Sequence, residues 1–398
     1  MNPFYEKIIT ERDESCFKAD IEDNFNTIGK MLSGSRIALV GAAGSIGSSV
    51  VKTILRFAPK ALVLIDISEN NLVELIRDLR SSVDVKMPDD FSTLPIAMGS
   101  MEFNRYFAET RPFDYFLNLA AIKHVRSEKD IYCLIRMIDT NVLFMHDFLL
   151  ANPYKFKNVF SVSSDKAANP ANLMGATKMA MEQALLYRSK EQPFSTARFA
   201  NVAFSDGSLP YGFLRRIEKR QALSAPSDVK RYFISHQEAG ELCTMSAFAG
   251  ENRAVFFPKF MEGRDEKTFS RIAEDLLASL GYESFPCASE DEARRRTEEL
   301  IPKKQWPCYF FRSDTTGEKD FEEFYVSTED VDFERFRNIG VIRRGDPVDR
   351  AAVEEFLAFA RSARERRELG KGDYVRALEK LVPTLRHLET GKNLDGKM

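Results

Sequence analysis

The stretch Arg36-Ile-Ala-Leu-Val40-Gly41-Ala-Ala-Gly44-Ser-Ile-Gly47 joins a five-residue apolar run to a loop with three glycines, and a helical run follows over 48–56. The apolar run predicts a buried strand. In a strand–loop–helix unit, such glycines permit a tight turn, close approach to a pyrophosphate, and packing of the helix on the strand. The stretch therefore predicts a dinucleotide-binding loop, whose expected cofactor contacts are Gly41, Gly44, Ser45, Ile46 and Gly47.

A second apolar run, Ala61-Leu-Val-Leu-Ile65, ends in Asp66, which lies 25 residues after Gly41. An acidic side chain at that place accepts hydrogen bonds from the adenine ribose and repels a 2′-phosphate, so it favours NAD over NADP. The alternative is a glycine-rich turn followed by an unrelated surface aspartate. The register of strand, loop, helix, strand and acid favours the dinucleotide site.

Strand and helix patterns continue to alternate along the chain. Apolar runs at 94–98, 113–121, 158–162 and 194–199 predict strands, and 131–150 and 179–187 predict helices. The alternation implies an α/β fold, a Rossmann-type doubly wound parallel sheet. We expect an N-terminal helical extension (1–35), an NAD-binding domain (36–205), a smaller mixed α/β substrate lobe interleaved with it (206–345), and C-terminal helices (346–398).

Composition excludes several classes of function. The chain has 398 residues, a formal net charge of −3 and a sequence pI of about 6.0, so no global basic field recruits nucleic acid. Five cysteines lie far apart without a Cys-x-x-Cys pair, and only four histidines are present, which argues against a metal site or a disulfide framework. The N-terminus is too charged for a signal peptide and no apolar run reaches 18 residues, so we expect a cytoplasmic protein without a membrane segment.

Two strand ends carry the groups that suit a ligand site. The predicted strand 158–162 leads into Ser163-Ser-Asp-Lys-Ala167, and Met174-Gly-Ala-Thr-Lys178 follows. Ligands of open α/β sheets bind at the carboxyl ends of the strands. The strand 113–121 ends in a pair of small residues that suits a backbone lying against the cofactor. The candidates at these two ends are Ala120, Ala121 and Lys123, and Ser164, Asp165, Lys166, Met174 and Lys178.

Less specific interpretations exist for some of these residues. In an arbitrary loop, Asp165 and Lys166 would be a solvated turn pair, but their place at a strand end beside a dinucleotide favours a function. For His124, a hydrogen-bonded structural histidine is as probable as a functional one. For Arg231, a surface arginine beside an apolar strand and a phosphate-binding arginine are equally consistent with the sequence.

Six motifs together resemble one family, the extended short-chain dehydrogenase/reductases of polysaccharide biosynthesis, and within it the UDP-N-acetylglucosamine 4,6-dehydratases. The resemblance runs from about residue 36 to about 240. The combination of Ser-Asp-Lys-Ala with Met-x-x-x-Lys is specific, whereas the glycine loop alone is not. The motifs are Gly41-Ala-Ala-Gly-Ser-Ile-Gly47, Ala120-Ala-Ile-Lys-His-Val125, Ser163-Ser-Asp-Lys-Ala167, Met174-Gly-Ala-Thr-Lys178, Arg198-Phe-Ala-Asn-Val202 and Gly207-Ser-Leu-Pro210.

Three departures from the family pattern affect the site. The superfamily's usual Tyr-x-x-x-Lys has Met174 in place of tyrosine, and a thioether cannot exchange a proton; a subgroup of the dehydratases is similar in this. An acid often found after the third strand is replaced by Gly99-Ser100. The family's Arg-Pro-Gly-Glu-Lys loop resembles Thr315-Thr-Gly-Glu-Lys319 here, so the arginine that meets the nucleotide phosphates would come from elsewhere, for example Arg312.

The reaction that the resemblance implies needs a base, an acid and groups that hold the sugar, so we assign candidates to these roles, while the role of Lys178 and the substrate contacts follow from the resemblance itself. Asp165 would donate a proton to the departing 6-hydroxyl, Ser164 would hold the sugar, and Lys178 would hold the nicotinamide ribose. Lys166 would be the base, because partial burial and the positive nicotinamide would lower the pKa of its amine. The expected substrate contacts are Lys123, Asn201, Arg231 and Glu318.

The resulting prediction is an NAD-dependent hydro-lyase that converts UDP-N-acetylglucosamine into a 4-keto-6-deoxy sugar nucleotide for a surface glycan. The resemblance and the terminal helices suggest a homo-oligomer. One alternative is a UDP-sugar 4-epimerase of the same superfamily, which the missing tyrosine disfavours. The other is a non-catalytic NAD-binding protein, which the intact Asp165–Lys166 pair disfavours.

Overall fold

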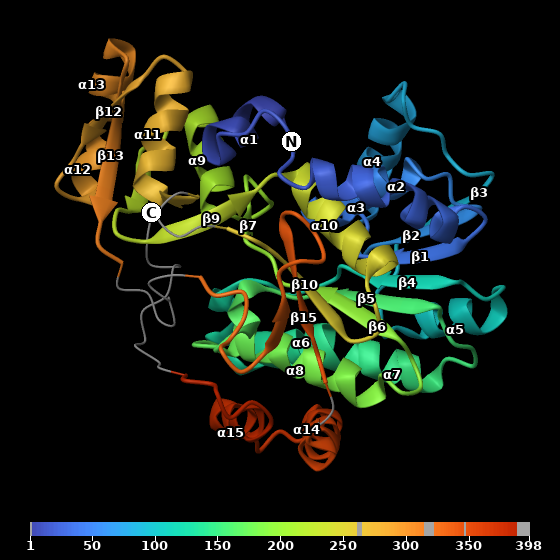
Figure 1. The fold of residues 1–398 in the computed structure, drawn as a ribbon. Coiled ribbons are helices and arrows are strands. Elements are labelled where there is room, and N and C mark those ends of the chain that lie inside the picture. Colours follow the sequence, from blue (N-terminus) through green and yellow to red (C-terminus); the bar gives the residue numbers. More distant parts are fainter. Residues whose placement is uncertain (1, 261–264, 314–321, 346–347, 388–398) are drawn as a thin grey trace.

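The computed structural model describes residues 2–260, 265–313, 322–345 and 348–387. Its centre is a nine-stranded sheet in the order β14-β15-β10-β6-β5-β4-β1-β2-β3 (Figure 1). All neighbours from β10 to β3 pair in parallel, and β15 and β14 extend the sheet by antiparallel pairing. The predicted α/β fold with a doubly wound parallel sheet is confirmed. The strands are β1 (Arg36–Val40), β2 (Ala61–Ile65), β3 (Asp90–Leu94), β4 (Tyr115–Asn118), β5 (Asn158–Val162), β6 (Phe194–Ala197), β10 (Ala254–Pro258), β14 (Asp330–Asp332) and β15 (Ile339–Arg343).

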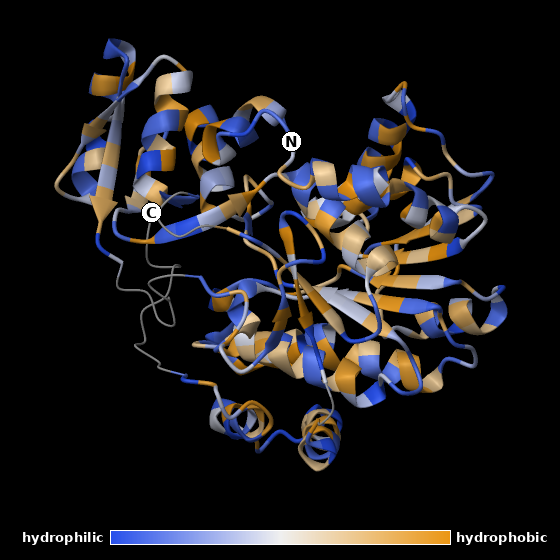
Figure 2. Ribbon diagram, in the orientation of Figure 1, coloured by the Kyte–Doolittle hydropathy of each residue, from blue (hydrophilic) through white to orange (hydrophobic). Residues whose placement is uncertain are grey.

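Helices cover both faces of this sheet, and each face has its own apolar core. Figure 2 shows these helices banded in hydrophilic and hydrophobic colours, as expected of helices that bury one side. One face carries α2 (Lys18–Leu32), α3 (Ser45–Leu55), α4 (Glu69–Ser81) and α10 (His236–Ala249). The other carries α5 (Met101–Glu109), α6 (Ile131–Ile138), α7 (Phe144–Ala151) and α8 (Leu173–Arg188).

The C-terminal helices α14 (Arg350–Ala363) and α15 (Lys371–Leu381) form a hairpin that packs against α8. Val353, Phe356 and Leu357 of this hairpin belong to the same buried cluster as the apolar side of α8. Beyond the hairpin, the Arg386 amide donates to the Pro170 carbonyl at 3.0 Å. The C-terminal part of the chain therefore extends to the loop between β5 and α8.

A smaller layer lies beside the large sheet and has its own core around Trp306. Residues 206–345 contribute to both parts, because β10, β14 and β15 join the large sheet while the rest builds the smaller layer. That layer contains the three-stranded sheets β11-β9-β7 and β12-β13-β8. Its elements are α1 (Pro3–Thr10), β7 (Asn201–Val202), α9 (Leu209–Glu218), β8 (Leu223–Pro226), β9 (Lys230–Ile234), β11 (Glu266–Thr268), α11 (Phe269–Ser279), β12 (Glu283–Pro286), α12 (Glu290–Arg295), α13 (Thr297–Leu300) and β13 (Gln305–Phe311).

Two predicted elements differ from the structure. The third strand was expected at 94–98 but ends at Leu94, because Pro95 has no N–H to donate to the ladder. The helix expected over 131–150 is interrupted by a π-helical turn, Asp139–Leu143, between α6 and α7. Such turns are rare inside helices and occur often at functional sites.

The glycine loop between β1 and α3 leaves no room for side chains at two of its three glycines. Gly41 has φ +75°, and a Cβ there would lie 2.5 Å from the Ala120 amide nitrogen. A Cβ on Gly47 would lie 2.0 Å from the Gly41 carbonyl oxygen, whereas the nearest atom to a Cβ on Gly44 is 3.6 Å away. Gly41 and Gly47 are therefore required by the fold itself, and Gly44 is not.

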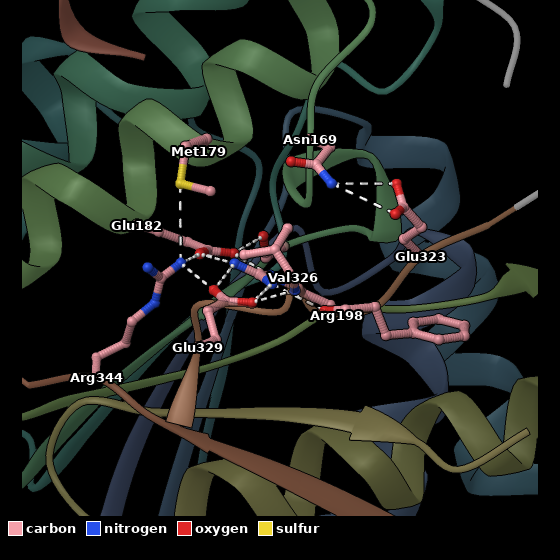
Figure 3. Close-up of polar contacts among 10 residues, drawn as sticks. Asn169, Met179, Glu182, Arg198, Glu323, Val326, Glu329 and Arg344 are labelled. Atoms are coloured by element: carbon pink, nitrogen blue, oxygen red, sulfur yellow. Dashed lines mark hydrogen bonds and ion pairs between the residues drawn. The ribbon is translucent and has the colours of Figure 1, made fainter. Parts of the chain in front are cut away.

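A buried cluster of ionised side chains fixes α8 to the sheet (Figure 3). Arg198, which follows β6 and is 0% exposed, donates to Glu182 of α8 at 2.8 and 3.0 Å and to Glu329 at 2.9 Å. Arg344, just after β15, donates to Glu182 at 2.7 Å and lies 3.0 Å from Glu329. The cluster thus joins α8, β6, β15 and the segment before β14.

The charges of this cluster compensate one another. Burial alone would raise the pKa of Glu182, but Arg198, Arg344 and a hydrogen bond from Ser163 outweigh it and lower that pKa to about 2. Ser163 lies at the end of β5 and donates to Glu182 at 2.6 Å. The cluster therefore also holds the strand end at which the Asp165–Lys166 turn begins.

We expect Gly47→Ala to destabilise the protein by about 1–3 kcal/mol or more, because the new methyl group meets backbone atoms that cannot move independently. Gly44→Ala is the matched control and should change the free energy of unfolding little, since its Cβ has space. Urea denaturation of both variants measures the difference, and equal stability of the two would contradict it.

We expect Arg344→Met to cost about 3–5 kcal/mol, because it leaves two buried carboxylates with a single cation. Its neighbour Arg343 is 58% exposed and pairs with Asp332, so Arg343→Met should cost less than about 1 kcal/mol.

The effect of Arg344→Met should also depend on pH. The lowered pKa of Glu182 makes its contribution to stability fully present above the ordinary value of 4.5 and lost as pH falls towards about 2. The difference between wild type and variant, measured by urea denaturation, should therefore shrink over that range. A constant difference would mean that Glu182 is not the carboxylate concerned.

Candidate active site at the carboxyl ends of β4 and β5

The segments that leave β4 and β5 lie at the same edge of the sheet as the glycine loop. The Leu119 amide donates to the Val40 carbonyl at 2.8 Å, so the chain after β4 runs beside the end of β1. The Ser163 and Asp165 amides donate to the Ala197 and Phe199 carbonyls. The chain after β5 therefore stays hydrogen-bonded to the end of β6 and to the segment that follows it. Carboxyl ends of parallel strands form the ligand-binding edge in this kind of fold.

Asp165 and Lys166 form a side-chain pair in the short 3₁₀ turn after β5 (Asp165–Ala167). The Lys166 Nζ lies 3.2 Å from both carboxylate oxygens of Asp165, and the Ser164 hydroxyl donates to Oδ1 at 2.8 Å. Asp165 is buried, while 30% of the Lys166 side chain is exposed. The three residues predicted for this corner are thus brought together.

The pKa of Lys166 shifts in the direction opposite to the prediction. Burial lowers it, but Asp165 and then Glu322 raise it by more, so the amine is held in its charged form by the protein's own groups. As far as the protein's own groups go, the prediction was wrong, because it considered burial and the nicotinamide and omitted the effect of the two carboxyl groups.

The start of α8 is pressed against this turn. Asn172 caps the helix by accepting from the Gly175 amide at 2.8 Å, and Glu128 accepts from the Leu173 amide at 2.6 Å. A Cβ on Gly175 would lie 2.3 Å from the Lys166 carbonyl oxygen, so only glycine permits this approach. Met174, the second residue of the helix, is buried.

Lys178 lies one helical turn after Met174 and is buried. Its Nζ donates to the Val162 carbonyl at 2.9 Å. Burial lowers the pKa of this amine to about 8, although Glu182 partly opposes the shift. Lys178 therefore lies beneath the end of β5, close in the chain to the Asp165–Lys166 turn.

Asn141 in the π-helical turn connects the two strand-end segments. Its Oδ1 accepts from the Ile122 amide at 2.9 Å, and its Nδ2 donates to the Ile122 carbonyl and to the Thr177 hydroxyl at 3.0 and 2.9 Å. The extra residue of the turn aims this side chain at the loop after β4. The sequence contained the asparagine, but no pattern in it indicated this role.

The predicted cofactor residues other than Lys178 form the glycine loop or adjoin it. Asp66 accepts from the Ala43 amide at 3.0 Å and from the Ser68 amide at 2.9 Å, so it fastens the loop to the end of β2. Ser45 begins α3 and accepts from the Asp206 amide at 2.9 Å. Ala120 and Ala121 lie where the chain passes the loop, and Ile46 packs partly on the core.

The predicted substrate residues fall into separate groups. Asn201 and Arg231 meet at Glu322, a residue that the sequence analysis missed: Asn201 Nδ2 donates to its Oε1 at 2.6 Å, and Arg231 Nε lies 3.7 Å from that oxygen. Lys123 lies after β4, where burial lowers its pKa and Asp206 partly opposes the shift. Arg312 is 90% exposed and pairs with Asp228 at 3.8 Å, and Glu318 lies outside the described residues.

Comparison with known proteins places this chain in a family. Residues 37–343 match the family described as polysaccharide biosynthesis protein. The chain is 27% identical to an uncharacterized membrane protein of Methanocaldococcus jannaschii over 80% of its own length and 88% of the relative's. In the chain described here, every helix within the described residues is too short or too polar to traverse a bilayer.

Other relatives carry names that describe an activity or a pathway. A UDP-N-acetylglucosamine 4,6-dehydratase (inverting) of Campylobacter jejuni is 26% identical over 63% of this chain and 74% of its own. Two longer relatives, named for polysaccharide biosynthesis in Bacillus subtilis and Staphylococcus aureus, are spanned by this chain over only 42% and 40% of their lengths.

Among solved structures, that of Pen from Bacillus thuringiensis matches with a TM-score of 0.63 and 19% identity, covering 83% of this chain and 98% of that one. At this identity the likeness concerns the fold alone. The family match covers the large sheet together with most of the smaller layer. The chain therefore belongs to the polysaccharide biosynthesis protein family of extended short-chain dehydrogenase/reductases.

Proposed function

We propose that this protein uses NAD to dehydrate UDP-N-acetylglucosamine to a UDP-4-keto-6-deoxy-N-acetylhexosamine. The observation that carries the proposal is the buried Asp165 paired with Lys166 at the carboxyl end of β5, at the same edge of the sheet as the glycine loop. An acid and an amine in contact supply both partners of a proton exchange. Similarity to the dehydratase of Campylobacter jejuni supports the choice of substrate and reaction.

The residues around the glycine loop fit a dinucleotide. The first turn of α3 contains no acidic side chain, so its free amides and the positive end of the helix dipole suit a pyrophosphate. Gly44 leaves space for close approach. Asp66 has lone pairs left for ribose hydroxyls besides the two amides it accepts, and its charge would repel a 2′-phosphate, so NAD is favoured over NADP.

When bound, NAD⁺ supplies a hydride acceptor for the sugar C4 and a donor for C6. The protein's own groups handle protons. Two protons leave the sugar, from O4 and C5, and two return, to the departing 6-hydroxyl and to C5. The Asp165–Lys166 pair can therefore take part in every transfer and end the cycle in its starting state.

The protonation states that this chemistry requires differ from the observed ion pair by the position of one proton. A base and an acid are needed together, that is, a neutral Lys166 amine and a protonated Asp165. They arise from the observed ion pair when one proton moves across the 3.2 Å contact. Met174 cannot exchange a proton, so it leaves this work to the pair. Ser164, whose hydroxyl donates to Asp165, would hold that carboxyl or the sugar in position.

We expect purified protein to convert UDP-N-acetylglucosamine into a product lighter by one water, detected by mass spectrometry. Lys166→Ala should lower the turnover by about 10²- to 10⁴-fold, because it removes the base. Lys157→Ala is the matched control, since Lys157 is a 63% exposed lysine that pairs with Asp114 away from this turn; its turnover should match the wild type.

Other results of the same assay would replace the proposal. An isobaric product would indicate a UDP-sugar 4-epimerase. Tight NAD retention without conversion of the sugar nucleotide would indicate a non-catalytic NAD-binding protein. Full activity of Lys166→Ala would mean that another residue is the base.

A further inference from the structure

Glu128 is a buried carboxyl group that joins the two strand-end segments of the site. It is 5% exposed and ends the short 3₁₀ turn Val125–Glu128, which follows the segment that leaves β4. Its Oε2 accepts from the amide of Leu173, the first residue of α8, at 2.6 Å. A carboxylate from one loop therefore holds the start of the helix that carries Met174 and Lys178.

The first turn of α8 needs this carboxylate. The first amides of a helix have no partner within the helix, and the positive end of the helix dipole lies there. Asn172 satisfies one of these amides, that of Gly175, at 2.8 Å, but the first turn contains no acidic side chain. Glu128 supplies a further acceptor and the missing negative charge from outside the helix.

The start of α8 in turn supports the Asp165–Lys166 turn. A Cβ on Gly175 would lie 2.3 Å from the Lys166 carbonyl oxygen, so the helix backbone lies directly against that residue. The turn is closed by its own hydrogen bonds, in which the Ala167 and Ala168 amides are the donors. A shift of the helix start would therefore move the backbone of Lys166.

The C-terminal segment 385–387 reaches the same carboxyl group. His387 Nε2 lies 3.7 Å from Glu128 Oε1, and the two side chains are only 8% and 7% exposed. The Arg386 amide donates to the Pro170 carbonyl at 3.0 Å, in the loop that leads into α8. Leu385 is buried in the apolar core on the α8 face of the sheet. Residues beyond the C-terminal hairpin are thus part of the support of the site.

We propose that Glu128 is a positioning residue of the active site, which holds the start of α8 so that the Asp165–Lys166 turn keeps its place, and that the C-terminal segment shields this contact from water. The inference rests on the proposed function where that function names Lys166 as the base. Proton transfer depends steeply on the placement of the base, and a displacement of about 1 Å can cost on the order of 10²-fold in rate. Glu128 thus acts on the reaction through the backbone of its neighbours.

Steady-state kinetics of two variants test this role. Glu128→Ala should lower kcat for UDP-N-acetylglucosamine by about 10- to 100-fold, and KM should change less, because the substrate candidates Asn201 and Arg231 lie on β7 and β9. Glu128→Gln should keep most of the kcat, because its side-chain oxygen can accept from the same amide. An unchanged kcat in Glu128→Ala would overturn the inference, and so would a kcat for Glu128→Gln as low as that of Glu128→Ala.

Asp20→Ala is the matched control. Asp20 is also a buried carboxyl group, 1% exposed, and it accepts from the backbone amides of Arg337 and Asn338 at 2.6 and 2.9 Å. It lies on α2, which covers the opposite face of the sheet from α8. Asp20→Ala should therefore lower the free energy of unfolding, as Glu128→Ala does, but leave kcat unchanged. An equal loss of kcat in both variants would indicate general destabilisation and would overturn the inference.

A second measurement needs no turnover. Hydrogen exchange at single amides, read by mass spectrometry with electron-transfer fragmentation, reports how often the turn opens. The Ala167 and Ala168 amides donate within the turn, yet they should exchange several-fold faster in Glu128→Ala and in His387→Ala than in the wild type, and at the wild-type rate in Asp20→Ala. Unchanged exchange in Glu128→Ala would overturn the inference, and unchanged exchange in His387→Ala would overturn the part that concerns the C-terminal segment.

The two measurements separate the inference from the proposed function. If the wild type does not dehydrate UDP-N-acetylglucosamine, that function fails, and the exchange result alone decides on the link between Glu128 and the turn. If Glu128→Ala does not fold, as its melting curve would show, Glu128→Asp withdraws the carboxylate from the Leu173 amide by one methylene group. Faster exchange at Ala167 and Ala168 is then expected of Glu128→Asp, and its absence would overturn the inference.

Discussion

The guanidinium of Arg198, fully buried between the carboxylates of Glu182 and Glu329, is the contact on which the arrangement of the site depends. It makes hydrogen bonds to both carboxylates and one to the Phe324 carbonyl at 2.8 Å. These bonds fasten α8 and the segment around 324–329 to the end of β6. Glu182 then holds Ser163, and Glu322 stands two residues before Phe324. An ion cluster of this kind contributes fixed geometry more than net stability, because burying its charges costs nearly what their attraction returns.

The sequence was most informative where a short segment determines its own conformation. Residues close together in the chain determine the glycine loop, the place of Asp66 at a strand end and the alternation of strands with helices. The parallel sheet and the position of its ligand-binding edge could therefore be predicted. The third strand was predicted too late in the chain, because the prediction followed the apolar residues and ignored that Pro95 has no N–H for strand pairing. The π-helical turn at Asn141 was missed because its residues fit an ordinary helix equally well.

The site was harder to predict, since its decisive contacts join distant parts of the chain. Asp165 and Lys166 were found from their strand end, but Glu322 lies more than 150 positions later, and nothing local distinguishes it from Glu323. Asp165 and, after it, Glu322 together outweigh burial and reverse the direction expected for the pKa of Lys166. The sequence showed Gly175 only as part of a motif and did not show why a glycine is needed there. The reason is that a Cβ at this position would lie 2.3 Å from the Lys166 carbonyl oxygen.

The packing of α14 and α15 on α8 has a consequence for the order in which the chain is made. A ribosome delivers residues from the N-terminus, and domains tend to fold as they emerge. Part of the cover of α8 comes from α14 and α15, within residues 350–381, and β6 gains its second neighbour only when β10 appears. A nascent chain that has already completed the glycine loop therefore still exposes apolar side chains of α8 and the unpaired edge of β6. Chaperones that recognise such surfaces have their longest opportunity during synthesis of the second half of this protein.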